Sequence, residues 1–173
     1  MKKILYMFLY MFLGYASAKS NTEKLGDVLA FVLPAAAYGS TFYMDDEEGR
    51  EQFFLAYGSA MSSTIALKYT VRAKRPDNND RDSFPSGHTL SAISGAVFIH
   101  RRYGLKYALP VYLGAFYTGY SRIRVSRHYP RDVLAGALIG ALSGWYFVSP
   151  MQKLSVTPKV ENGYKGIQVN YRF

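Results

Sequence analysis

The chain has 173 residues, a hydrophobic fraction of 49% and a formal net charge of +9 at pH 7. This length favours one domain with a true core, and a sequence without cysteine excludes a disulfide framework, a thiolate nucleophile and a cysteine-ligated metal. The positive charge favours anionic partners, but the cations lie within short motifs and no nucleic-acid-binding module is recognisable. We therefore expect a phosphorylated molecule or a membrane surface as partner, and no nucleic acid.

Residues 1–18 have the layout of a secretory signal peptide. Met1-Lys2-Lys3 is a short basic start, residues 4–13 are uncharged and apolar, and Ala16-Ser17-Ala18 offers the small residues that a signal peptidase reads. A retained membrane anchor is the alternative, although a bilayer asks for roughly 20 apolar residues. We expect cleavage after Ala18, which would place the mature protein in the periplasm, either free or associated with a membrane.

Residues 19–150 are predicted to form one helical domain. Asp27 is suited to cap the first helix, which Pro34 would kink or split, and Pro76 should stop the second. Gly104 is suited to end the third helix, and Pro130 to begin the last. The expected helices span residues 27–44, 51–74, 86–102, 106–120 and 130–149, with a polar loop over 77–85.

The last predicted helix and the C-terminal tail differ in character. Gly136, Gly140 and Gly144 share one helix face, which lets another backbone approach closely, in a membrane or in a soluble bundle alike. Residues 151–173 instead contain two alternating runs around Asn162-Gly163, a strong signal for a β-hairpin. Two strands cannot close a membrane barrel, so we expect an appendage folded onto the bundle.

Three short strings carry residues suited to phosphate chemistry. In the first, Lys68 and Arg75 are seven residues apart and so lie on nearly one helix face, where an ammonium and a guanidinium could bind phosphate oxygens. In the second, Ser86-Gly87-His88 opens a helix, where free backbone N–H groups bind anions. Ser86 could donate its hydroxyl, and His88 could protonate a leaving oxygen. Taken singly, each string is explained as well by a basic helix end or an ordinary helix start.

The third string places His128 four residues before Asp132. At that spacing Asp132 could accept a hydrogen bond from one imidazole nitrogen, which would fix the tautomer and leave the other nitrogen to attack phosphorus. Arg122, six residues before His128, could bridge the bound phosphate. Two histidines and a carboxylate could also bind zinc or iron, but the neighbouring cations would repel a dication, so we expect no metal and no other cofactor.

Together the strings resemble the signature of the type-2 phosphatidate phosphatase and vanadium haloperoxidase superfamily. Its blocks are Lys-x6-Arg-Pro, Pro-Ser-Gly-His and Ser-Arg-x5-His-x3-Asp, and they are filled here over residues 68–76, 85–88 and 121–132. The resemblance implies a mostly helical core, and with the elements expected above the predicted fold class is all-α, a bundle of five to six helices followed by the small hairpin. It also implies a phosphohistidine on His128, oriented by Asp132, with His88 as acid and then base. The phosphate-binding residues that it implies are Lys68, Arg75, Ser86, Gly87 and Arg122.

The function expected from these motifs is metal-independent hydrolysis of phosphate monoesters or pyrophosphates, most of all lipid-linked ones, outside the cytoplasm. Vanadate mimics phosphate, so a vanadate-dependent haloperoxidase is one alternative. An envelope protein that binds phosphate or lipid without catalysis is another. The sequence sets neither the headgroup of the substrate nor the oligomeric state.

Overall fold

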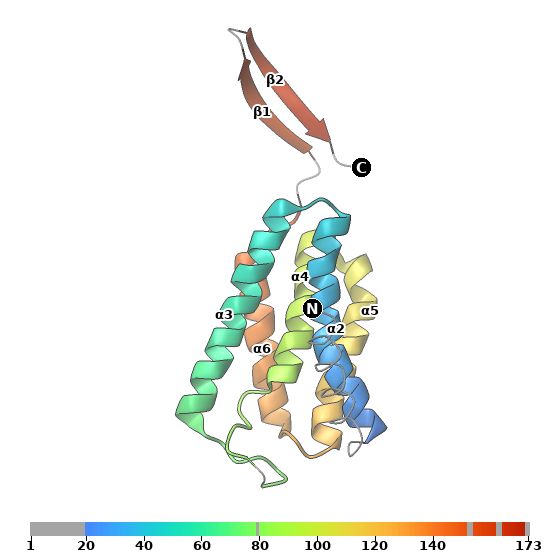
Figure 1. Ribbon diagram of the computed structural model, residues 1–173, viewed down its shortest axis with the longest axis vertical. Helices are drawn as coiled ribbons and strands as arrows, with labels where there is room; N and C mark the ends of the chain where they lie inside the picture. Colours follow the sequence, from blue (N-terminus) through green and yellow to red (C-terminus); the bar gives the residue numbers. More distant parts are fainter. Residues whose placement is uncertain (1–19, 79, 152–153, 162–163, 172–173) are drawn as a thin grey trace, which may run out of the picture.

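The computed structural model describes residues 20–78, 80–151, 154–161 and 164–171, and the predicted signal peptide lies outside them. Within these residues the fold is a bundle of five α-helices followed by one two-stranded antiparallel sheet (Figure 1), which confirms the predicted fold class. The elements are α2 (Asn21–Tyr43), α3 (Glu47–Val71), α4 (Gly87–Tyr103), α5 (Leu105–Arg124), α6 (Pro130–Phe147), β1 (Leu154–Glu161) and β2 (Tyr164–Tyr171).

Helix α2 begins six residues earlier than predicted because Ser20, not Asp27, is its cap. The Ser20 hydroxyl oxygen accepts a hydrogen bond from the Glu23 backbone N–H at 3.2 Å, which satisfies one of the free donors of the first turn. Asp27 therefore lies well inside the helix, where its side chain is available for other contacts. Pro34 also lies inside one continuous helix, so it does not split α2 in two.

Two further helix ends differ from the prediction, and both affect residues of the motifs. Helix α3 ends at Val71 rather than Lys74, because Arg72 adopts a left-handed conformation with φ 47° and ψ 41°. Helix α5 continues to Arg124, past the predicted end at Tyr120, so Ser121 and Arg122 stand on its last turns rather than in a loop. Helices α4 and α6 begin within one residue of the predicted positions.

Helix α4 is the centre of the bundle, and all its residues from Thr89 to Ile99 are buried. The predicted glycine stripe of α6 packs against it: a Cβ on Gly136 would collide with the Ser86 carbonyl, and one on Gly140 with the Leu90 carbonyl. Only glycine permits this approach of the two backbones. The contact brings the start of α6 against the start of α4, and with it the third motif against the second.

The hairpin pairs Leu154 with Tyr171 through to Glu161 with Tyr164, and the predicted turn residues Asn162-Gly163 lie outside the described residues. The prediction that it folds onto the bundle was wrong. The described parts of β1 and β2 contact each other and none of the helices, and the hairpin projects from the end of the bundle where α2 meets α3. The three motifs gather at the opposite end (Figure 1).

Candidate active site

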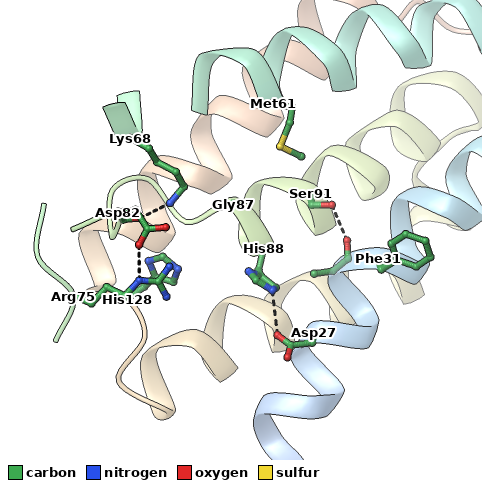
Figure 2. A pocket seen from close by; sticks show the side chains of 11 residues that line it. Asp27, Phe31, Met61, Lys68, Arg75, Asp82, Gly87, His88, Ser91 and His128 are labelled. Atoms are coloured by element: carbon green, nitrogen blue, oxygen red, sulfur yellow. Dashed lines mark hydrogen bonds and ion pairs between the residues drawn. The ribbon is translucent and has the colours of Figure 1, made fainter. Parts of the chain in front are cut away.

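A cavity of about 400 Å³ opens at the end of the bundle farthest from the hairpin. Five predicted site residues line it: Lys68 from α3, Arg75 from the following loop, Gly87 and His88 from the start of α4, and His128 from the turn before α6. Figure 2 shows the cations and His128 on one side of the cavity and His88 on the other. The lining residues that were not predicted are Asp27, Ala30, Phe31, Met61, Asp82 and Ser91.

His128 is held in one tautomer by a backbone carbonyl. Its Nδ1 lies 2.7 Å from the Ser83 carbonyl oxygen. A carbonyl can only accept, so Nδ1 carries the proton and donates, which leaves the Nε2 lone pair for reaction. Burial, aided by the positive charges of Arg75 and Lys68, lowers the pKa of His128 to about 4, against the opposing effects of the Ser83 hydrogen bond and Asp132. The imidazole is therefore neutral at pH 7, as a nucleophile must be.

The predicted hydrogen bond between Asp132 and His128 is absent from the described site. Asp132 Oδ2 is 4.0 Å from His128 Nδ1, beyond hydrogen-bond reach. Instead, Oδ2 accepts from the Ser83 hydroxyl at 2.5 Å and from the Tyr129 N–H at 3.0 Å, while the Asp132 carbonyl accepts from the Ser86 N–H at 2.9 Å. Asp132 therefore holds the Ser83 segment in place, and the Ser83 carbonyl in turn orients His128.

Asp82 holds both cations of the first motif. Its Oδ1 lies 2.8 Å from Arg75 Nε, and its backbone carbonyl accepts a hydrogen bond from Lys68 Nζ (Figure 2). The Arg75 hydrogen bond lowers the pKa of Asp82, so that this carboxyl is ionised at neutral pH. Because Asp82 uses Nε of Arg75, the two terminal nitrogens of the guanidinium are left as a fork for phosphate oxygens.

His88 is paired with Asp27, which the sequence analysis assigned only to a helix cap. His88 Nε2 lies 3.1 Å from Asp27 Oδ1 across the cavity, and the imidazole is about half exposed (Figure 2). The same Asp27 oxygen is 2.7 Å from Nη1 of Arg122. No local pattern could have revealed Asp27, because it stands on a different helix, far before the first motif in the chain.

Arg122 and Ser86 do not line the cavity as predicted. The Arg122 side chain is 3% exposed, and its three nitrogens donate to the Asp27 carboxylate, to the Glu23 carbonyl at 2.9 Å and to the Ser121 hydroxyl at 3.0 Å. It therefore faces α2, where it anchors Asp27. Ser86 is buried as the cap of α4, with its hydroxyl 3.0 Å from Thr89 Oγ1.

Gly87 leaves the start of α4 bare. A Cβ at this position would meet no atom within 4 Å, so the backbone N–H groups of the first turn open on the cavity. Free N–H groups at a helix start attract anions. Among the described residues, no three or more His, Asp or Glu side chains gather as a metal site would require. The cavity thus combines anion-binding donors with two histidines.

This combination agrees with the comparison with protein families, in which the model described as the PAP2 superfamily matches residues 51–155. The chain belongs to the PAP2 superfamily. The matched segment includes all three motifs, so the family predicted from them is confirmed.

The relatives differ in how much of their length the chain covers. It is 32% identical to the lipid A 4'-phosphatase of Helicobacter pylori over 187 aligned positions, which cover 96% of this chain and 94% of the relative. It is 41% identical to the lipid A 1-phosphatase of Porphyromonas gingivalis over 91 residues, which cover 50% of this chain and only 20% of that protein. Among solved structures, the crystal structure of Aquifex aeolicus LpxE is similar, with a TM-score of 0.56, 27% identity, and coverage of 80% of this chain and 92% of that chain.

Proposed function

We propose that this protein is a phosphatase that removes a phosphate group from a membrane lipid through a phosphohistidine on His128. One observation carries the proposal: a neutral imidazole with a free Nε2 lines the same cavity as Lys68, Arg75 and the bare start of α4. A nucleophile beside pre-placed cations and N–H groups is what phosphoryl transfer needs, since most of its barrier is lowered by positioning and electrostatics.

In the first step, Lys68, Arg75 and the N–H groups of Gly87 and His88 bind the phosphoryl oxygens. His128 Nε2 attacks phosphorus, a nitrogen–phosphorus bond forms, and the bond from phosphorus to the leaving oxygen breaks. His88, in its protonated form, gives its proton to that oxygen. The charge that builds on the His128 ring is stabilised by the Ser83 carbonyl at 2.7 Å and by Asp132 at 4.0 Å.

In the second step, His88, now neutral, removes a proton from water, and the oxygen of that water attacks phosphorus. The nitrogen–phosphorus bond breaks, inorganic phosphate leaves, and Nε2 of His128 regains its lone pair. Asp27 acts as a positioning residue in both steps, because it holds the His88 ring at 3.1 Å and is itself held by Arg122.

A lipid as the substrate is supported by the names of the relatives and by the outer surface of the bundle. Helix α5 carries an exposed apolar stripe of Leu109, Leu113 and Phe116. Helix α6 carries another, on the face opposite its glycines, of Leu134, Leu138 and Leu142. Helix α5 has 20 residues and so a length of about 30 Å, near the thickness of the bilayer core. Among the described helices, α2 is long and apolar enough to cross a membrane by length and composition. We place the bundle in a membrane on these grounds.

The cavity should face the periplasm. The basic start of the chain would stay in the cytoplasm, and the apolar segment behind it would lead Ser20 to the outer side, whether residues 1–18 are cleaved or retained. Helix α2 begins at Asn21, directly after its cap Ser20, and its first turns carry Asp27 into the cavity. The active site would then act on lipids of the outer leaflet.

The experiment that tests this function is phosphate release from lipid and soluble esters by the purified protein and by His128→Ala. We expect turnover that resists EDTA and is inhibited by vanadate, and a loss of at least about 10³-fold in the variant, the scale typical of removing a nucleophile. His100→Ala is the matched control, because His100 contacts Tyr112 and Trp145 on the other side of the bundle and should leave turnover unchanged. Full activity in His128→Ala would refute the mechanism, and bromide oxidation dependent on vanadate would favour a haloperoxidase instead.

A further inference from the structure

A second cavity, of about 610 Å³, lies directly beside the first. Its walls are the last turns of α3, with Ile65, Lys68, Tyr69 and Arg72, and the loop residues Arg81 and Asp82. Lys68 and Asp82 line both cavities, so these two side chains form the shared wall between them. A headgroup held with one phosphate at His128 could therefore reach the second cavity with its remaining part.

The second cavity carries positive charge that the protein itself does not neutralise. Within the described residues, neither Arg72 nor Arg81 has a side-chain hydrogen bond or ion pair, and both are exposed. Asp82 is the one carboxylate in the lining, and it is already paired with Arg75 at 2.8 Å. Two free guanidinium groups are thus presented on one side of the shared wall, where planar forks suit the oxygens of a phosphate.

The backbone at Arg72 supports a role for this side chain. Arg72 has φ 47° at the end of α3, a left-handed conformation that helix ends usually give to glycine or asparagine. A residue with a Cβ is strained there, and such strain is found preferentially at binding and catalytic sites. Tyr69, three residues earlier and 75% exposed, adds a flat ring on which the rest of a headgroup could pack.

We propose that this second cavity binds a second phosphate group, carried on the same lipid as the phosphate that is removed. The proposal rests on the proposed phosphatase function and narrows its substrate class to lipids whose headgroup bears two phosphates. Arg72 and Arg81 hold the phosphate that is kept, while Lys68 and Arg75 hold the one that leaves. The same chemistry could come from the phosphate of a neighbouring membrane lipid, and the experiment below separates the two.

The test measures binding rather than turnover, in the His128→Ala protein and in neutral detergent micelles. The ligands are a glycolipid with a disaccharide headgroup that bears two phosphate monoesters and the same glycolipid with one. We expect the second phosphate to tighten binding about tenfold or more, the scale of a good charge-assisted contact. Adding Arg72→Gln and Arg81→Gln should abolish this preference while binding of the one-phosphate lipid changes less than about twofold. Lys74→Gln, an exposed cation of the same segment outside the cavity lining, is the matched control and should keep the preference.

Each other outcome counts against the proposal. Equal affinity for the two lipids, or an equal loss for both in the arginine variants, would overturn it. An effect of the arginines that appears only when anionic phospholipid is added to the micelles would assign the cavity to a neighbouring lipid. Failure of the phosphatase function is visible separately, since protein with intact His128 would then release phosphate from neither lipid, whereas the binding preference would still be measured.

Discussion

The two ends of the bundle each hold a buried arginine paired with a carboxylate, but they differ in what the pair is free to do. At the end near the hairpin, Arg102 binds Asp46 through two hydrogen bonds of 2.7 and 2.6 Å and Glu48 at 2.9 Å, and the Tyr103 hydroxyl donates to the same aspartate at 3.0 Å. At the other end, Arg122 binds Asp27, and Asp27 binds His88.

The difference lies in what the last group of each cluster contacts. Arg102 and Asp46 have side chains 2% and 1% exposed, and their hydrogen bonds end on protein groups, which tie the turn between α2 and α3 to the end of α4. The chain of contacts from Arg122 ends instead on His88, which is 46% exposed in a cavity. A buried ion pair is therefore no sign of function by itself. The cluster proposed as functional is the one whose outermost group is an imidazole, His88, which can give and take a proton beside His128 in the same cavity.

The largest effect that would sharpen this comparison is expected from Arg75→Gln. It removes a proposed phosphate-binding group from the end of the bundle that holds the cavity, and we expect turnover to fall about 10²–10³-fold, as when one preorganised donor is lost. It also removes a positive charge that helps to lower the pKa of His128, so that this pKa rises. Since the neutral imidazole is the proposed nucleophile, the acid limb of kcat/KM should move to higher pH than the limb near pH 4 expected of the parent. An acid limb that stays in place would mean that His128 is not the titrating nucleophile.

The next prediction concerns the residues that orient His128, the proposed nucleophile. Asp132→Asn should lower turnover about 10²-fold, because a small misplacement of the imidazole costs that much. If Asp132 acts through Ser83, then Ser83→Ala should also be impaired, and the double variant should be no worse than Asp132→Asn alone. Measuring kcat for the three variants shows whether Asp132 acts on His128 through Ser83. Near-normal turnover in Ser83→Ala would favour direct action of Asp132 on His128.

Much of this architecture could be predicted from the sequence because its signals are local. Pro130 and the helix start at Ser86 are read within a few residues, and helices α4 and α6 begin where predicted. The stripe of Gly136, Gly140 and Gly144 predicted a close backbone contact, and all three glycines pack on α4. The motifs likewise predicted five of the residues that line the cavity.

What the sequence could not predict depends on contacts between distant segments. A carboxylate four residues after a histidine was expected to bind it, but the Ser83 carbonyl, which no side-chain pattern records, takes that place. Arg122 was expected at the phosphate, but α2 packs against it and Asp27 meets its guanidinium first. Asp27 itself was predicted to be a helix cap, but Ser20 is the cap and leaves Asp27 inside the helix. Here the motifs predicted which side chains gather at the cavity, but their spacing did not predict the hydrogen-bond partners of those side chains.

A smaller effect is expected at Asp27, which links Arg122 to His88. Asp27→Asn should lower turnover about tenfold for an alkyl phosphate, as part of the contribution that a general acid makes. It should have little effect on an aryl phosphate such as p-nitrophenyl phosphate, whose leaving oxygen needs no proton. Measuring kcat for both substrates therefore separates a role through His88 from general damage to the fold.

Two controls make that measurement decisive. In a His88→Ala background, adding Asp27→Asn should cause no further loss, because the residue acts through that imidazole. Glu23→Gln removes an ion pair with Arg127 at 3.0 Å, one turn earlier on the same helix, and should leave both substrates unaffected. Equal losses on the two substrates in Asp27→Asn would reduce Asp27 to a structural partner of Arg122.

The smallest effect on turnover is expected at the end near the hairpin, where Asp46 pairs with Arg102. Asp46→Asn leaves Arg102 as a buried charge that has lost an ionised partner, which should cost about 3 kcal/mol of stability. At a temperature where both proteins are folded, kcat should stay within about twofold, since this cluster touches no group of the cavity that holds His88 and His128.

Burial opposes ionisation of Asp46, but hydrogen bonds from Arg102, the Gly49 N–H and Tyr103 outweigh it and lower its pKa below 3.8. The stabilisation is therefore complete above that value and is lost as the pH falls through the lowered pKa, so the stability difference between parent and variant should shrink in acid. Thermal unfolding at several pH values measures that difference, and a large loss of kcat in the folded variant would mean that the two ends are coupled.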